Sequence, residues 1–215
     1  MSDALVTAIK AGDVDDVRRL VTERPELASA RDENGLPAIL LALFHRQPAV
    51  ADVLLAAGPE LGILEAAAAG RADRVQELLA ADPDTRHERT PEGFTVLGLA
   101  AFLGGPEVVG VLLAAGADPD DDGDNPLRVR PVHAAAAARD GASLRLLLEA
   151  GADPNVRQQG GFTPLHAAAH ADEPEIARLL LDHGADPSAT TDDGRDAARI
   201  AAEEGGERVT AVLAG

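Results

Sequence analysis

The sequence contains no cysteine, tryptophan or tyrosine, and only four phenylalanines and one methionine. Without cysteine the chain can form no disulfide and can use no thiolate as nucleophile or metal ligand. Aromatic residues make up 2% of the 215 positions, so alanine, leucine and valine must fill the core. Small aliphatic side chains of this kind suit stacked helices, whose backbones approach one another closely.

Long apolar runs are absent as well. No stretch approaches the roughly 18 apolar residues that a membrane-spanning helix needs, and the first residues carry an acid, Asp3, where a secretion signal would carry basic residues. We therefore expect a cytoplasmic protein. The basic residues are almost all arginine, and alanine and glycine are abundant. This usage is typical of GC-rich bacterial genomes and indicates a bacterial source.

Positive charge is scarce. Lys and Arg total 19 against 37 Asp and Glu, which gives a net charge of −18. Such a chain repels nucleic acids and anionic membrane surfaces unless a basic patch overrides the field, and the sequence has no Lys/Arg cluster of the usual kind. We expect no nucleic acid and no membrane as partners. A basic protein partner is compatible with the charge, and so is a simple role in solubility.

A repeat of 33 to 35 residues runs through the chain. The string Gly-Ala-Asp-Pro begins at Gly116, Gly151 and Gly184, and Gly-Phe-Thr begins at Gly93 and Gly161. After each Gly-Phe-Thr comes an alanine-rich segment, a short break and a segment rich in Leu or Val. Capping hydroxyls, prolines at the first helical position and glycines at helix ends accompany these segments. The pattern predicts stacked helix–turn–helix units.

The most regular unit resembles an ankyrin repeat over its full length. It reads Gly161-Phe-Thr-Pro-Leu-His-Ala-Ala-Ala, then Glu175-Ile-Ala-Arg-Leu-Leu-Leu, then Gly184-Ala-Asp-Pro. The resemblance implies an all-α ankyrin-repeat solenoid with short β-hairpin fingers, forming a single domain over residues 1–215. It comprises about seven units, caps included, at residues 1–33, 34–60, 61–91, 92–126, 127–159, 160–192 and 193–215.

The connection between units two and three departs from the family pattern. Only Pro59-Glu60-Leu61-Gly62 separate Gly58 from the next predicted helix. The finger that the family places there should be missing or reduced to a tight turn, which would leave a notch in the array. One hypothesis makes this notch a pocket for a small-molecule enzyme or binder, with Glu65 as acid or base. Its lining would be Phe44, His45, Leu64, Glu65 and Phe102.

Two motifs suggest metal binding, and in both we favour a structural role. Asp118–Asp124 alternates carboxylates as calcium loops do, but Val129 stands where a bidentate Glu belongs. His133 and His166 match a family position whose ring hydrogen-bonds to the backbone across the repeat interface. We predict no metal and no cofactor.

The resemblance also implies a binding surface. In this family the residue after the turn glycine and the residues that end the first helix face the concave groove. The positions so mapped are Leu36, Phe44, His45, Phe94, Phe102, Leu103, Val129, Phe162 and His170. All four phenylalanines fall among them, as a binding surface would require. The alternative is structural, with these rings packing against neighbouring fingers or covering the missing one.

The family resemblance implies a non-catalytic scaffold that binds a protein partner in its concave groove, the acidic rim favouring a basic partner. The sequence offers few candidate nucleophiles for catalysis, since the few serines lie outside any Gly-x-Ser-x-Gly turn. An alternative within the binding class is an acidic antitoxin or immunity-type inhibitor of a basic protein. The enzyme at the notch is the second alternative.

Overall fold

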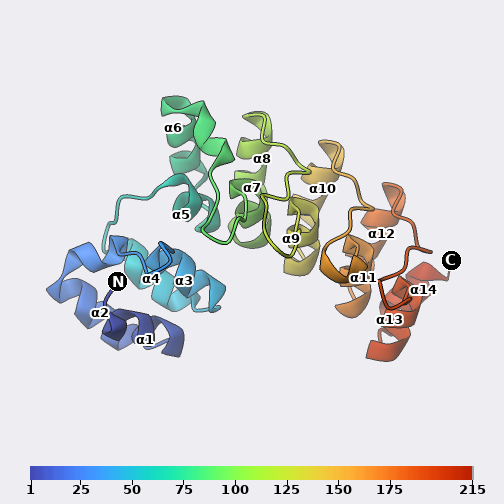
Figure 1. Cartoon of the computed structure of the whole chain (residues 1–215), viewed down its shortest axis with the longest axis horizontal. Coiled ribbons are helices and arrows are strands. Elements are labelled where there is room, and N and C mark those ends of the chain that lie inside the picture. Colours follow the sequence, from blue (N-terminus) through green and yellow to red (C-terminus); the bar gives the residue numbers. More distant parts are fainter. Residues whose placement is uncertain (215) are drawn as a thin grey trace.

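The computed structural model describes residues 1–214, which form an arched stack of helix pairs (Figure 1). Within this range fourteen α-helices occur, and each of the seven predicted units contains one pair. The helices are α1 (Asp3–Ala11), α2 (Val14–Glu23), α3 (Ala38–Phe44), α4 (Pro48–Ala56), α5 (Ile63–Ala68), α6 (Ala72–Ala81), α7 (Val96–Leu99), α8 (Pro106–Ala114), α9 (Pro131–Ala138), α10 (Gly141–Glu149), α11 (Pro164–His170), α12 (Pro174–Asp182), α13 (Ala197–Glu204) and α14 (Glu207–Leu213). The all-α solenoid predicted from the sequence is confirmed.

Short irregular helices extend several units. The 3-10 helices η1 (Pro25–Ser29) and η2 (Pro83–His87) follow α2 and α6, and η4 (Gln159–Gly161) precedes α11. The π-helical turn η3 (Ala100–Gly104) continues α7. No helix within residues 1–214 is both long enough and apolar enough to cross a membrane.

Local capping explains where many helices begin. The Thr95 hydroxyl accepts a hydrogen bond from the Gly98 backbone N–H at 2.9 Å, and Asp140 and Asp196 cap α10 and α13 in the same way. At the start of α11 the Thr163 hydroxyl lies 2.9 Å from Nδ1 of His166, and the Thr163 backbone N–H donates to the same nitrogen at 2.9 Å. The imidazole therefore provides a hydrogen-bond acceptor for the Thr163 N–H at this helix start.

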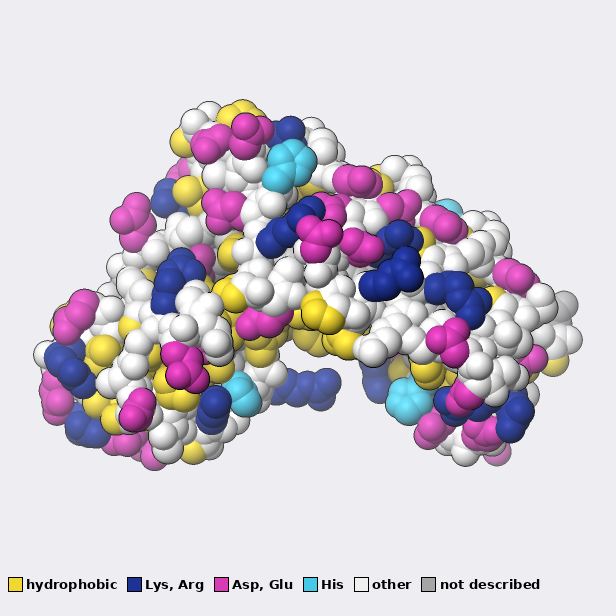
Figure 2. Space-filling model, viewed as in Figure 1, with side chains coloured by type: hydrophobic (Ala, Val, Ile, Leu, Met, Phe, Trp, Pro, Cys, Tyr) yellow, Lys and Arg dark blue, Asp and Glu magenta, His cyan; other side chains and the backbone are white. Residues whose placement is uncertain are grey.

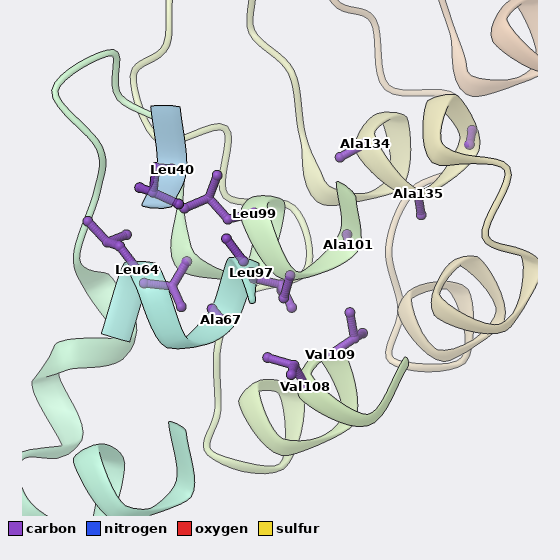
Figure 3. Close-up of a cluster of buried hydrophobic side chains, with 14 of the residues drawn as sticks. Leu40, Leu64, Ala67, Leu97, Leu99, Ala101, Val108, Val109, Ala134 and Ala135 are labelled. Atoms are coloured by element: carbon purple, nitrogen blue, oxygen red, sulfur yellow. The ribbon is translucent and has the colours of Figure 1, made fainter. Parts of the chain in front are cut away.

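Inner and outer helices stack in two layers around a continuous aliphatic core. The odd-numbered helices form the inner layer, each packed on the next from α1 to α13. Leu64 of α5 and Leu97 of α7 both belong to the cluster of buried side chains shown in Figure 3. Each fully buried leucine stabilises the fold by about 1.5–3 kcal/mol relative to an exposed one. None of the four phenylalanines is fully buried, so the core holds without them.

The fingers are smaller than the predicted β-hairpins. Within the described residues they contain two isolated antiparallel bridges, Arg31 with Pro37 and Arg89 with Thr95, and no longer strand. Hydrogen bonds from side chains, rather than a ladder of backbone hydrogen bonds between strands, stabilise these turns. The Asp32 carboxylate, for example, accepts hydrogen bonds from the backbone N–H groups of Asn34 and Leu36 at 2.9 and 2.8 Å. Such an aspartate turn stabilises a short loop without strands.

The stack is interrupted where the finger between units two and three is missing. Inner helix α3 still packs on α5, but a hollow of about 750 Å³ lies between the outer helices α4 and α6. On the finger side the gap is closed, because Gly35 of one finger lies close to Pro91 of the next. A Cβ atom placed on Gly35 would lie 3.8 Å from Cγ of Pro91. The fingers of units two and four have thus become neighbours. We call the space between α4 and α6 the notch hollow.

Candidate functional site

An apolar hollow of about 410 Å³ opens among the fingers and inner helices of units two, four, five and six. Its aromatic wall consists of Phe44, Phe94 and Phe102, and its aliphatic wall of Leu99, Val129, Ala134, Ala137 and Ala167. The polar groups at its lining belong to Glu92, Thr95, His133 and Gln158. A volume of this size with few polar groups is typical of binding pockets.

Figure 2 shows the setting of this surface. The molecule is hollowed on one side, hydrophobic side chains run along the roof of that concavity, and Lys and Arg side chains flank it. Phe102 and Leu127 are the two large hydrophobic residues classed as exposed in residues 1–214, at 39% and 47%. Phe102 lines the apolar hollow, and Leu127 lies two residues before Val129, which also lines it.

The missing finger helps to shape the hollow. No residue between positions 61 and 91 lines it, although unit three lies between units two and four in the sequence. Phe44, at the end of α3, instead faces the finger of unit four, which carries Phe94. The hollow therefore depends on the same departure from the repeat pattern that opens the notch hollow.

A glycine makes room inside the hollow. Gly98 is the third residue of its inner helix, the position that His133 and His166 occupy in units five and six. The imidazoles of His133 and His166 are buried next to their helix starts, whereas Gly98 has no side chain at this position and lines the hollow, as His133 does.

Phe102 lies in the π-helical turn η3, which continues α7. The turn adds no residue to the unit, because α8 begins ten residues after α7, as α10 does after α9. Phe102 is exposed at the seventh position of its inner helical segment, and so is Ala137 at the same position of unit five. The exposure of Phe102 thus follows from its place in the repeat.

The nine residues that the sequence predicts for the groove lie in different environments. Four of the nine, Phe44, Phe94, Phe102 and Val129, line the apolar hollow together. Leu36 does not fit the expectation of an exposed groove residue, because it is 6% exposed and belongs to the core.

The other four predicted residues lie outside the lining of the hollow. His45 is exposed at the end of α3, and Leu103 is half-buried in η3. Phe162 is half-buried, with its ring edge-on to His166 at 5.9 Å between centroids. His170 is exposed, and its Nδ1 lies 3.2 Å from a carboxylate oxygen of Glu204.

The buried histidines hold the repeat interfaces together. Nε2 of His133 lies 3.1 Å from the carbonyl of Val156, and Nδ1 accepts from the Arg130 N–H at 3.3 Å. Burial lowers the pKa of His133 to about 4, against partial opposition from its backbone hydrogen bonds. His166 repeats the arrangement with the Ala189 carbonyl at 3.0 Å, and burial lowers its pKa as well. Both rings thus have the structural geometry that the resemblance implied.

The acidic loop is used in contacts between fingers. Arg89 lies 3.1 Å from a carboxylate oxygen of Asp121 and 2.7 Å from one of Asp124. Asp120 accepts a hydrogen bond from the Asp153 N–H at 3.2 Å. Among residues 1–214 no group of three or more His, Asp or Glu side chains is arranged to hold a metal ion.

Arginines border the apolar hollow on one side. A second, polar hollow of about 450 Å³ is lined by Arg128, Arg130 and Arg157, together with Gln158 and Asp192. Arg157 lies 3.6 Å from Asp192. The polar hollow and the apolar hollow share Gln158, so they are adjacent. Gly98, Leu127 and these arginines were not among the residues predicted from the sequence, and the alternation Arg128-Val129-Arg130 is the signal that could have located the arginines.

The geometry does not support the pocket expected for an enzyme at the notch. The notch hollow is lined by Leu55, Pro59, Leu61 and charged side chains of α6, and by none of the five residues named for it. Phe44 and Phe102 belong to the apolar hollow instead. The predicted acid or base, Glu65, is 7% exposed and lies 2.9 Å from the Arg31 guanidinium.

Comparisons with known proteins agree with the repeat pattern. The family model described as ankyrin repeats (3 copies) matches residues 132–215, and the model of a single ankyrin repeat matches residues 92–125. No curated protein matches the chain.

Proposed function

Because the chain belongs to the ankyrin-repeat family, we propose that it is a scaffold that holds a protein partner in its concave groove, anchored at the apolar hollow. Ankyrin repeats generally mediate protein–protein interaction, and domains built from them are typically non-catalytic. The partner and its pathway are not identified by the family.

The observation that carries this proposal is the placement of Phe44, Phe94 and Phe102. An aliphatic core would gain from burying these rings, yet all three line one hollow, and Phe102 is 39% exposed there. Aromatic side chains supply much of the binding energy at protein interfaces. Their collection at one concave point supports a binding anchor.

Replacement of two residues of η3, Phe102 and Leu103, tests the proposal. Phe102→Ser/Leu103→Ser should keep the helical circular dichroism spectrum and lose a partner that the wild-type protein captures from lysate of its source. Leu55→Ser, on the outer face of α4, is a matched control that removes an apolar side chain elsewhere. Equal capture by all three proteins, measured by quantitative mass spectrometry, would place the binding site outside the apolar hollow.

The charge of the partner is a separate question. The expectation of a basic partner rests on the net charge of −18, which is an average over the whole chain. Beside the apolar hollow the local charges have the opposite sign, because three arginines face one aspartate in the polar hollow. Short-range recognition follows the local charges more closely than the average.

A further inference from the structure

We propose that the segment bound in the groove is an acidic peptide segment, with one bulky apolar side chain in the apolar hollow and neighbouring carboxylates on Arg128 and Arg130. This inference rests on the proposed function and deepens it. It commits to a protein segment with Asp or Glu residues next to the anchoring side chain.

The two hollows form one continuous recognition surface. Val129 lines the apolar hollow, while Arg128 and Arg130, on either side of it in the sequence, line the polar hollow. Gln158 lines both. A side chain seated against Val129 therefore places the adjoining residues of its own chain within reach of the guanidinium groups.

Neither arginine is neutralised by the protein. Within residues 1–214 no carboxylate lies within 4.0 Å of Arg128 or Arg130, although acidic residues outnumber basic ones by 37 to 19 in the chain. Other arginines near the fingers do have such partners: Arg89 with two aspartates and Arg157 with one. Five other arginines among the described residues also lack a carboxylate partner: Arg24, Arg46, Arg71, Arg145 and Arg178. Arg128 and Arg130 differ from these in lining a hollow adjacent to the apolar hollow, where a bound segment could supply the counter-charge.

The chemistry of arginine suits an acidic segment. A planar guanidinium group can donate to both oxygens of a carboxylate at once. Arg128 is exposed and Arg130 is partly exposed, so both can be reached from solvent.

The backbone of the arginine segment is already ordered for binding. The buried Asn125 side chain accepts from the Val129 N–H at 2.9 Å and donates to the Val129 carbonyl at 3.0 Å. The Arg128 N–H donates to the Asn125 carbonyl at 2.9 Å, and the Leu127 carbonyl accepts from the Gln159 N–H at 2.8 Å. A fixed segment loses little conformational entropy on binding, so its contacts contribute more fully to affinity.

The carboxylate of Glu92 makes the two ends of the site differ in charge. Glu92 is exposed and lines the apolar hollow together with Phe94 of the same finger. It repels acidic residues from its own vicinity, whereas Arg128 and Arg130 attract them. Repulsion of this kind fixes orientation as effectively as attraction does. The acidic residues of the bound segment should therefore lie on the arginine side of its anchor.

Selection from a phage-displayed library of random dodecapeptides tests the inference. The expected result is an enriched family with one Trp, Phe, Leu or Met next to Asp or Glu. Synthetic fluorescent peptides of that family should bind Arg128→Ser/Arg130→Ser about tenfold more weakly than wild type in fluorescence anisotropy. Sodium chloride should weaken the wild-type complex and have less effect on the variant.

Matched variants separate this inference from the proposed function. Arg145→Ser/Arg178→Ser removes two exposed arginines from α10 and α12 and should leave affinity unchanged. Peptides that need Phe102 but bind Arg128→Ser/Arg130→Ser within twofold would overturn the acidic segment and leave the groove in place. Basic or neutral flanking residues in the enriched family, or no enriched family, would also overturn it. Binding unaffected by Phe102→Ser would instead count against the groove itself.

Discussion

The Arg31 guanidinium lies 2.9 Å from a carboxylate oxygen of Glu65, across the place where the finger between units two and three is missing. The Glu65 side chain is 9% exposed and that of Arg31 is 52% exposed. Burial, and after it repulsion from Glu65, raises the pKa of the nearby Glu88 carboxyl group, while Arg31 acts in the opposite direction. One arginine thus offsets two carboxylates at the discontinuity of the stack.

Removal of Arg31 should destabilise the protein more than neutralisation of Glu65. Arg31→Ala leaves a buried carboxylate uncompensated, and we expect a loss of about 1–2 kcal/mol in the free energy of unfolding, lowered from the fully buried case because Arg31 is half-exposed. Glu65→Gln keeps a hydrogen-bond acceptor without the charge and should cost less. Urea unfolding measures both. Glu60→Gln, at a side chain that is 93% exposed, is the control. A larger loss for Glu65→Gln than for Arg31→Ala would refute this account of the pair.

Protonation of His133 should weaken the fold in mild acid. Because burial lowers its pKa from 6.5 to about 4, the unfolded chain binds a proton in this range and the folded chain does not. The stability that the neutral ring contributes is complete above pH 6.5 and is lost as the pH falls to 4, by about 3 kcal/mol from this group alone.

The variant His133→Asn isolates that contribution. Its free energy of unfolding, measured in urea from pH 7 to pH 4, should fall less steeply than that of wild type. His87→Asn, at an exposed position, should retain the wild-type slope. Parallel curves for wild type and His133→Asn would show that the acid sensitivity arises elsewhere.

Two glycines should respond in opposite ways to alanine. A Cβ atom on Gly104, in η3, would overlap the backbone carbonyl of Ala67, whereas one on Gly110, inside α8, would meet no atom within 4 Å. Gly110→Ala should stabilise the protein by about 0.5–1 kcal/mol through helix propensity. Gly104→Ala should destabilise it by more than that amount, because unit four must shift away from unit three. Thermal unfolding followed by circular dichroism decides the matter, and a stabilising Gly104→Ala would contradict the close approach.

Units one and two should open independently of the rest. They contact unit three through the packing of α3 on α5 and the ion pair of Arg31 with Glu65, while the notch hollow separates α4 from α6. In a linear array, stability depends on each interface between neighbours, so a reduced interface divides the molecule. Hydrogen exchange followed by mass spectrometry should find faster exchange in α1 to α4 than in α7 to α12. Uniform protection across all these helices would contradict the prediction, because units one and two would then open together with the rest of the array.

Much of the fold was predictable because its determinants are local. The Gly-Ala-Asp-Pro strings, the prolines at helix starts and the aliphatic spacing each act within a few residues, and they located the helix pairs. The missing finger was also visible, since it required only a count of residues between Gly58 and Ile63. The β-hairpin fingers were not realised as strands in the described residues, because side-chain hydrogen bonds from residues such as Asp32 complete these turns.

The site was predictable only in part. The exclusion of phenylalanine from the core pointed to Phe44, Phe94 and Phe102, which meet in the apolar hollow. Leu36, mapped to the groove by its place in the repeat, is 6% exposed and belongs to the core. Such burial depends on tertiary packing, which the repeat pattern alone does not encode. Gly98 likewise lines the hollow without any local signal in the sequence.

The breadth of the apolar hollow limits how far the protein can be shortened. Its walls extend from Phe44 in unit two to Ala167 in unit six, so a truncated array that begins at unit four would retain most repeats and lose one side of the cavity. Such a fragment, even if folded, would lack the side of the hollow that Phe44 forms. Under the proposed function, domain dissection of this chain should therefore keep units two to six together.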